Sequence, residues 1–176
     1  SISHNGNLVN AEQLTKELYK DNYRHLNTSS DSEVILNVFA HELQQASSFN
    51  PTPEQIFKAV EKTHLRLQGA YSVLLMISGV GLVGIRDPKG IRPLILGKKD
   101  NDLIGSDYMI ASESPALSAL EFEIEGDLKP GEAVFITLDG EIHRKVCHSE
   151  PSKNPCIFEY VYLARPDAVI DGISVV

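Results

Sequence analysis

The sequence has few of the features that mark secreted, membrane-spanning or nucleic-acid-binding proteins. It contains only two cysteines, Cys147 and Cys156, so it implies no disulfide framework and fits a reducing cytosol. No run is long and apolar enough to cross a bilayer, and the first residues lack the pattern of a signal peptide. The net charge of -8 and the 16 scattered basic residues disfavour a nucleic-acid or anionic-membrane partner. We expect a cytoplasmic protein.

Local motifs for metals, nucleotides and common nucleophiles are missing as well. The six histidines include no i, i+4 pair, and Cys147-His148 with Cys156 lacks a zinc-type spacing. The sequence has no Walker loop, no G-x-G-x-x-G and no G-x-S-x-G. We therefore expect no metal site, and the two cysteines are most simply small buried or half-buried residues.

The first 70 of the 176 residues predict three helices in one well-buried domain. Apolar residues recur with a 3.6-residue period, and each stretch begins with a capping signal. The first helix is expected over residues 11–23, and "NTSSDSEV" and "NPTPEQ" begin the other two. The residues that predict these caps are Asn10 with Gln13, Ser30 with Glu33, and Thr52 with Gln55.

After Gly69, a natural C-cap, the pattern changes to short apolar runs that predict strands. "AYSVLLMI" and "GLVGIR" form a pair, "DPKG" fits a type I turn, and "KKDNDLIGSD" is expected to be a loop. A later hairpin has Asp139-Gly140 in a type I′ turn. Continuous apolar strands imply a sheet covered on both faces. Helices followed by consecutive strands predict α+β layers rather than a doubly wound sheet.

Few residues indicate a catalytic or binding role by themselves. Asn5 and Gly6 combine a side-chain amide with a backbone N–H, as an oxyanion hole requires, although a plain turn is the more frequent interpretation of Asn-Gly. Asp31 lies in the first turn of a helix, where a favourable interaction of its carboxylate with the helix dipole is a sufficient reason for an acidic residue. Alternatively, its carboxylate holds the ammonium group of a substrate.

Charged residues also gather around the "DPKG" turn. Arg86, Asp87 and Arg92 favour a structural ion-pair cluster over a catalytic one, and Arg165 in "ARPD" could serve a domain contact.

Several longer segments occur in order along the chain: "SHNGNLVN", "RHLNTSSDSE", "RLQGAYSVLLM", "RDPKGIRPLILG", "YMIASES", "DLKPGEAVFIT" and "FEYVYLARPDAVIDGISV". Taken together, they resemble one family, the amidophosphoribosyltransferases, which are glutamine phosphoribosylpyrophosphate amidotransferases. The resemblance implies an N-terminal-nucleophile hydrolase fold, an αββα four-layer sandwich that is incomplete at its N-terminus. Residues 1–150 would be the later part of the class II glutamine amidotransferase (glutaminase) domain. Residues 151–176 would end it and begin a link to a missing phosphoribosyltransferase domain.

The resemblance also implies an activity. The family hydrolyses glutamine and transfers the ammonia to phosphoribosylpyrophosphate, giving phosphoribosylamine in the first committed step of purine synthesis. The parent enzyme is expected to be a cytosolic homo-oligomer. Its Mg²⁺ site would lie in the missing phosphoribosyltransferase domain, so no cofactor is expected in this chain.

By resemblance, Asn5 and Gly6 are the two oxyanion donors, and Asp31 binds the α-amino group of glutamine. The family's nucleophilic cysteine and the arginine that holds the substrate carboxylate have no counterpart, and Ser1 is not expected to replace the cysteine. Some members bind an iron–sulfur cluster through a cysteine at the position of Cys156, which makes Cys156 a candidate ligand; the other ligands would lie beyond residue 176.

We therefore expect a fragment of such an enzyme that is inactive alone, because both ends look cut and the nucleophile is absent. The alternatives are a non-catalytic binding or assembly module with the same fold and a sibling class II amidotransferase. Unpaired strand edges predict marginal stability or self-association.

Overall fold

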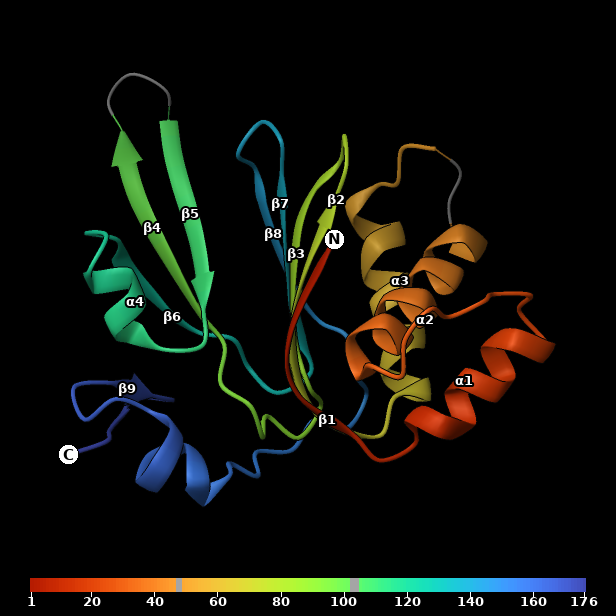
Figure 1. The fold of residues 1–176 in the computed structure, drawn as a ribbon. Coiled ribbons are helices and arrows are strands. Elements are labelled where there is room, and N and C mark those ends of the chain that lie inside the picture. The colour runs from red at the N-terminus through yellow and green to blue at the C-terminus, as the bar shows by residue number, and fades with distance from the viewer. Residues whose placement is uncertain (47–48, 102–104) are drawn as a thin grey trace.

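The computed structural model describes residues 1–46, 49–101 and 105–176, and a five-stranded antiparallel sheet lies at its centre (Figure 1). The strand order is β1-β2-β3-β7-β8, so β1 and β8 are the two edges. The strands are β1 (Ile2–Leu8), β2 (Gly69–Ile77), β3 (Gly81–Arg86), β7 (Glu132–Thr137) and β8 (Ile142–Val146). Three helices lie on one side of this sheet: α1 (Ala11–Lys20), α2 (Asp31–Ala46) and α3 (Pro53–Arg66).

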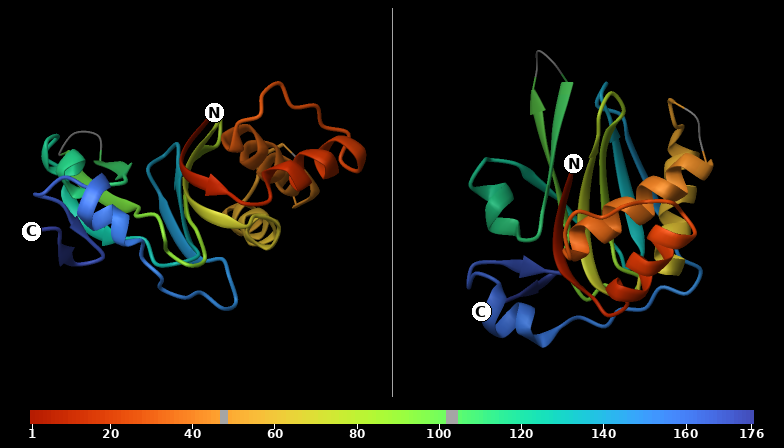
Figure 2. Two further views of the ribbon diagram at one scale, coloured as in Figure 1. Left: turned by 60° about the horizontal axis from the view of Figure 1, so that its bottom comes forward. Right: turned by 45° about the vertical axis from the view of Figure 1, so that its right-hand side comes forward.

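A second antiparallel sheet lies on the other side, as both views of Figure 2 show. Its order is β5-β4-β6, from β4 (Ile95–Asn101), β5 (Gly105–Ala111) and β6 (Glu123–Asp127). The short helix α4 (Ser114–Ser118) covers its outer face, where Leu117 packs so closely on Gly97 that a Cβ there would lie 2.9 Å from Leu117 Cδ2. The layers are therefore helices, sheet, sheet and a reduced outer helical layer.

The C-terminal segment after β8 lies below the second sheet (Figure 1). It contains the single π-helical turn η1 (Glu159–Leu163) and the small pair β9 (Val169–Ile170) and β10 (Ile173–Ser174). Two ion pairs hold it, one between Arg86 and Asp171 and one between Arg92 and Glu159.

Two apolar cores explain this layering. On the helix side of the central sheet, alternate residues such as Tyr71, Val73 and Leu75 of β2 are buried against the helices. On the opposite side, Val134 and Ile136 of β7 pack with a cluster from the second sheet that comprises Leu94, Leu96, Ile110 and Leu128. Strands buried on both faces need continuous apolar runs, as predicted.

The three predicted helices are confirmed, but their starts differ in detail. The Thr52–Gln55 capping box forms as expected. The capping box predicted for Asn10 and Gln13 is wrong, because the Asn10 side chain makes no capping hydrogen bond. It instead donates to the Arg66 carbonyl and accepts from the Gln68 N–H, which ties α1 to the end of α3.

The start of α2 departs from the expected capping box in one respect. The Ser30 hydroxyl accepts from the Ser32 N–H as an N-cap should. The Glu33 carboxylate, however, accepts from the backbone N–H groups of Asn27 and Thr28 rather than from Ser30. These hydrogen bonds hold the pKa of Glu33 down at about 2.

Several strand predictions need correction. Gly69 begins β2 instead of capping α3, whose C-cap is Leu67. Much of the loop expected at 98–107 belongs to β4 and β5, and residues 102–104 lie outside the described residues. The Asp139-Gly140 turn is not type I′, because only Gly140 has a positive φ; Thr137 N–H donates to the Glu141 carbonyl across a three-residue loop. Strand β6 was not predicted.

Candidate functional site

Asn5 and Gly6 lie in the middle of β1, so the turn interpretation is wrong for this Asn-Gly pair. Asn5 is paired with Ser72 and Gly6 with Tyr71 on β2. Paired residues share a face, so the exposed Asn5 side chain points to the side of the second sheet, as Ser72 and Leu74 do. The amide is therefore presented beside the space between the sheets, at a free edge.

Gly6 meets two structural demands at once. Its φ is +141°, and a Cβ there would lie 2.0 Å from the carbonyl oxygen of Ala70, so no other residue fits. The N–H groups of Met76 and Val9 are bonded across the β1–β2 ladder, and antiparallel alternation then directs the N–H of Gly6 to the open edge. Gly6 can offer this donor next to the Asn5 amide.

Asp31 is brought to the same edge by a direct bond to β1. It is the first residue of α2, and its Oδ2 accepts the N–H of Leu8 at 2.7 Å. Leu8 stands two residues beyond Gly6, so both N–H groups leave the strand on the same side. Within the described residues Oδ1 has no hydrogen-bond partner, which leaves one carboxylate oxygen available to a ligand cation.

His4 precedes Asn5 on β1 and faces the helices, because it is paired with the buried Val73; the sequence had not indicated it as a site residue. Its Nδ1 lies 3.4 Å from the Ser32 hydroxyl, next to Asp31. Burial lowers the pKa of His4, while the charge of Asp31 acts to raise it and that of Arg92 to lower it. The imidazole is therefore neutral near pH 7 and adds no charge to the site.

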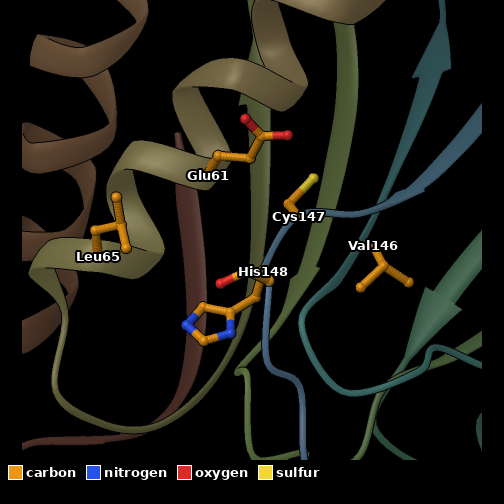
Figure 3. A pocket seen from close by; sticks show the side chains of 6 residues that line it. Glu61, Leu65, Val146, Cys147 and His148 are labelled. Atoms are coloured by element: carbon orange, nitrogen blue, oxygen red, sulfur yellow. The ribbon is translucent and has the colours of Figure 1, made fainter.

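The two cysteines lie elsewhere. Cys147 follows β8, at the edge of the sheet opposite β1, and lines a cavity of about 370 Å³ with Glu61 and Leu65 of α3 (Figure 3). Burial raises the pKa of its thiol to about 12, which leaves it protonated and unreactive. Cys156 is half-buried just before η1.

The sequence contains two cysteines, fewer than the four thiolates of a Cys₄ iron–sulfur cluster, so the other ligands of a cluster at Cys156 would have to lie outside this chain. Over residues 1–46, 49–101 and 105–176, no group of three or more possible metal ligands comes together.

In the same part of the chain, no helix combines the length and apolarity needed to cross a membrane.

The residues around the "DPKG" turn are structural, as predicted, but their partners differ from those expected. The Asp87 carboxylate accepts backbone N–H groups of Lys89, Ile91 and Arg92 instead of pairing with an arginine. Arg86 pairs with Asp171 from the C-terminal segment, which could not be foreseen from local sequence.

Comparisons with known proteins agree with this geometry. A family model described as a glutamine amidotransferase domain matches residues 1–119. Amidophosphoribosyltransferases from Pseudomonas aeruginosa, Escherichia coli and Saccharomyces cerevisiae are 54%, 49% and 45% identical over 99% of this chain. The chain spans 35% of the length of each of them, about a third.

Solved structures show the same fold. Glutamine phosphoribosylpyrophosphate amidotransferase from B. subtilis, complexed with ADP and GMP, has a TM-score of 0.80 and 32% identity over 99% of this chain and 34% of its own. A structure titled as the allosteric regulatory enzyme of purine biosynthesis has a TM-score of 0.79 with the same coverage. The predicted α+β fold of the N-terminal-nucleophile type is thereby confirmed. The match over residues 1–119 shows that the chain belongs to the glutamine amidotransferase domain family.

Proposed function

We propose that this chain is the later part of the glutaminase domain of an amidophosphoribosyltransferase. The whole enzyme hydrolyses glutamine and transfers the ammonia to phosphoribosylpyrophosphate, yielding phosphoribosylamine. The observation that carries the proposal is the grouping of Asn5, the open-edge N–H of Gly6 and Asp31 on one side of β1. Similarity to enzymes of this name over 99% of the chain supports it over a sibling class II amidotransferase.

The residues divide the chemistry between them. Attack of a thiolate on the glutamine carboxamide gives a tetrahedral oxyanion, and the Asn5 amide and the Gly6 N–H are the donors for it. The free oxygen of Asp31 accepts the α-amino group of glutamine, while its other oxygen stays bound to Leu8. The bond to Leu8 fixes the Asp31 carboxylate relative to the two oxyanion donors. One rigid strand therefore both positions the substrate and polarises its carboxamide.

The remaining functions are assigned to parts outside this chain. Cys147 follows the edge strand opposite β1 and Cys156 lies just before η1, so we assign the nucleophile to another part of the parent protein. In the proposed division, residues 1–150 belong to the glutaminase domain and 151–176 lead toward a phosphoribosyltransferase domain that binds phosphoribosylpyrophosphate with Mg²⁺. The parent enzyme is proposed to be a cytoplasmic homo-oligomer.

Glutamate release from glutamine tests the proposal. The 176-residue chain alone is expected to release none. In the full-length enzyme, Asn5→Ala should lower kcat about 10²–10³-fold, as expected for loss of one oxyanion donor. Asp31→Asn should chiefly raise KM. Asn7→Ala is the matched control, since Asn7 is exposed on the same strand and is expected to change neither constant greatly.

Two results would contradict the proposal. Glutamate release by the isolated chain that disappears with Asn5→Ala would show that the chain supplies its own nucleophile. A full-length protein that folds but does not hydrolyse glutamine would instead identify a non-catalytic module with the same fold.

A further inference from the structure

The segment 27–30, which leads into Asp31, is exposed at every position, so hydrogen bonds rather than burial have to order it. Asp31 is the first residue of α2, and the N–H groups in the first turn of a helix have no acceptors within the helix. Helix ends fray for this reason. The carboxylate proposed to bind glutamine therefore stands on a part of the chain that needs a support of its own.

The carboxylate of Glu33 supplies this support with both of its oxygens. Oε1 accepts the backbone N–H of Asn27 at 2.8 Å and its side-chain amide at 3.3 Å. Oε2 accepts the backbone N–H of Thr28 at 2.7 Å and its hydroxyl at 2.6 Å. These hydrogen bonds, that from the Asn27 N–H first, lower the pKa of Glu33 to about 2, so the carboxylate stays ionised near neutral pH.

The hydrogen bonds of Glu33 close residues 27–33 into a ring. The Thr28 hydroxyl, which donates to Glu33, accepts the N–H of Ser30 at 3.2 Å. The Ser30 carbonyl in turn accepts the N–H of Glu33 at 3.0 Å. Asp31 lies within this closed segment, and its side chain leaves the segment to bind the N–H of Leu8.

The 27–33 ring is set against β1 at two points, one on each side of Gly6. Asp31 Oδ2 lies 2.7 Å from the N–H of Leu8, two residues after Gly6. The Ser32 hydroxyl lies 3.4 Å from Nδ1 of His4, two residues before it. A shift of the ring would thus move the free oxygen of Asp31 relative to the Gly6 N–H, and a misplacement of about 1 Å is enough to weaken binding strongly.

We propose that Glu33 is a positioning residue of the glutamine site: by closing the 27–33 ring it holds the free oxygen of Asp31 where the α-ammonium group of glutamine binds. The inference rests on the proposed glutaminase function. In this role Glu33 acts on the substrate through Asp31. The ammonium group is bound alike in the ground state and the transition state, so loss of Glu33 should affect KM rather than kcat.

Glu33→Gln in the full-length enzyme tests the role of the carboxylate. Glutamine keeps the shape, but one of its two ends is an NH₂ group that cannot accept the N–H groups facing it. KM for glutamine should rise about tenfold, with kcat within about twofold of the wild type. Glu12→Gln is the matched control, since Glu12 is a first-turn carboxylate of α1 that pairs with the exposed Lys16, and it should change neither constant.

A second substrate separates positioning from general damage to the fold. Glutaramate is glutamine without the α-amino group, so it offers Asp31 nothing to bind. With glutaramate, Glu33→Gln should change kcat/KM by less than about twofold. Equal losses with both substrates would show that Glu33 only stabilises the fold and would overturn the proposal. On an Asp31→Asn background, Glu33→Gln should raise KM no further, and additive increases would also overturn it.

Two further results keep the test decisive. If Glu33→Gln does not fold, Thr28→Val removes only the hydroxyl that joins Glu33 to Ser30. It should raise KM for glutamine about threefold without affecting glutaramate, and an unchanged KM would overturn the proposal. If Asp31→Asn raises KM and Glu33→Gln does not, the proposal alone fails. If Asp31→Asn leaves KM unchanged, the assignment of Asp31 in the proposed function fails as well.

Discussion

At the scale of single residues, Gly6 shows how the backbone itself limits this site. The chain of β1 approaches β2 so closely that only a hydrogen fits at the Cα of Gly6, and the same holds at Gly69, where a Cβ would lie 2.2 Å from the Asn7 carbonyl. The two glycines mark the end of the ladder that carries the proposed donors. A side chain at either position has to push the strands apart.

Gly6→Ala is therefore expected to destabilise the fold by about 2–4 kcal/mol, because a close contact and an unfavourable φ are added together. Gly79→Ala is the matched control. Gly79 also has a positive φ, +74°, but a Cβ there meets nothing within 4 Å, so the cost should be about 1 kcal/mol. Urea unfolding of the two variants measures the difference, and equal losses would show that β1 can move to admit the methyl group.

Another single residue, His64, links stability to pH. Its Nδ1 lies 2.7 Å from the Tyr71 hydroxyl, and the ring is 3% exposed. Burial, together with the neighbouring His148, lowers the pKa of His64 to about 4, and the carbonyl of Gly131 opposes this in part. The folded protein thus holds this imidazole neutral where the unfolded chain would protonate it.

The unfolded state binds the extra proton between pH 6.5 and pH 4, so the free energy of unfolding should fall over this range as the pH is lowered and level off below it. The contribution is about 3 kcal/mol at most. His64→Gln should reduce the fall relative to the wild type in urea titrations at a series of pH values. His25→Gln, at an exposed site, serves as the control, and the same pH slope in all three proteins would disprove the assignment.

At the scale of elements, the C-terminal segment is tied to the rest of the chain by two ion pairs, Arg86 with Asp171 and Arg92 with Glu159. Arg86 gives Asp171 two hydrogen bonds, at 2.7 and 2.9 Å, and donates to the carbonyls of Gly90, Arg92 and Leu128 as well. A guanidinium buried in this way depends on its carboxylate partner, because without it the charge has no compensation.

Asp171→Asn should therefore cost about 3–5 kcal/mol and release the segment first. Asparagine tolerates the positive φ of 52° at this position, so the backbone is not the cause of the loss. Hydrogen exchange should increase in 156–176 before the helices are affected. Asp167→Asn removes an exposed ion pair with Arg165 and should change little. Uniform exchange in the Asp171 variant would mean that the segment unfolds only with the whole chain.

The elements also show which predictions local sequence supports. The Thr52–Gln55 box needs only residues three positions apart, and it was predicted correctly. Asn10 carries the same local signal, but tertiary contacts with the end of α3 use its side chain instead. Strand β6 was missed because "EIEGD" has little apolar alternation and is held by pairing with β4.

At the scale of the whole molecule, the central sheet ends in an open edge at β1. The even-numbered N–H groups of this strand face outward, and among the residues that the structure describes only the N–H of Leu8 is bound by a side chain, that of Asp31. An open strand edge is a template for pairing with another chain. This supports the expectation that the isolated chain self-associates.

Sedimentation velocity should show a concentration-dependent dimer of the 176-residue chain. Ser3→Lys, at an exposed position of β1, should weaken the dimer by placing a charge on the pairing edge. Ser118→Lys, at an exposed position of α4 on the outer face of the second sheet, is the control and should leave association unchanged. A chain that stays monomeric at high concentration and unfolds cooperatively at high temperature would show that the edge is adequately protected.

The sequence by itself determined the helices, most strands, the α+β layering and the family, because apolar periodicity, turn residues and ordered motifs are local properties of the chain. It also indicated Asn5, Gly6 and Asp31 as a group, through the resemblance. Only the tertiary structure decided that Asn5 and Gly6 lie in a strand, that Leu8 holds Asp31 there, and that Arg92 pairs with Glu159 of the C-terminal segment. Those outcomes depend on pairing register and on contacts between residues 23 to 67 positions apart, which no local pattern encodes.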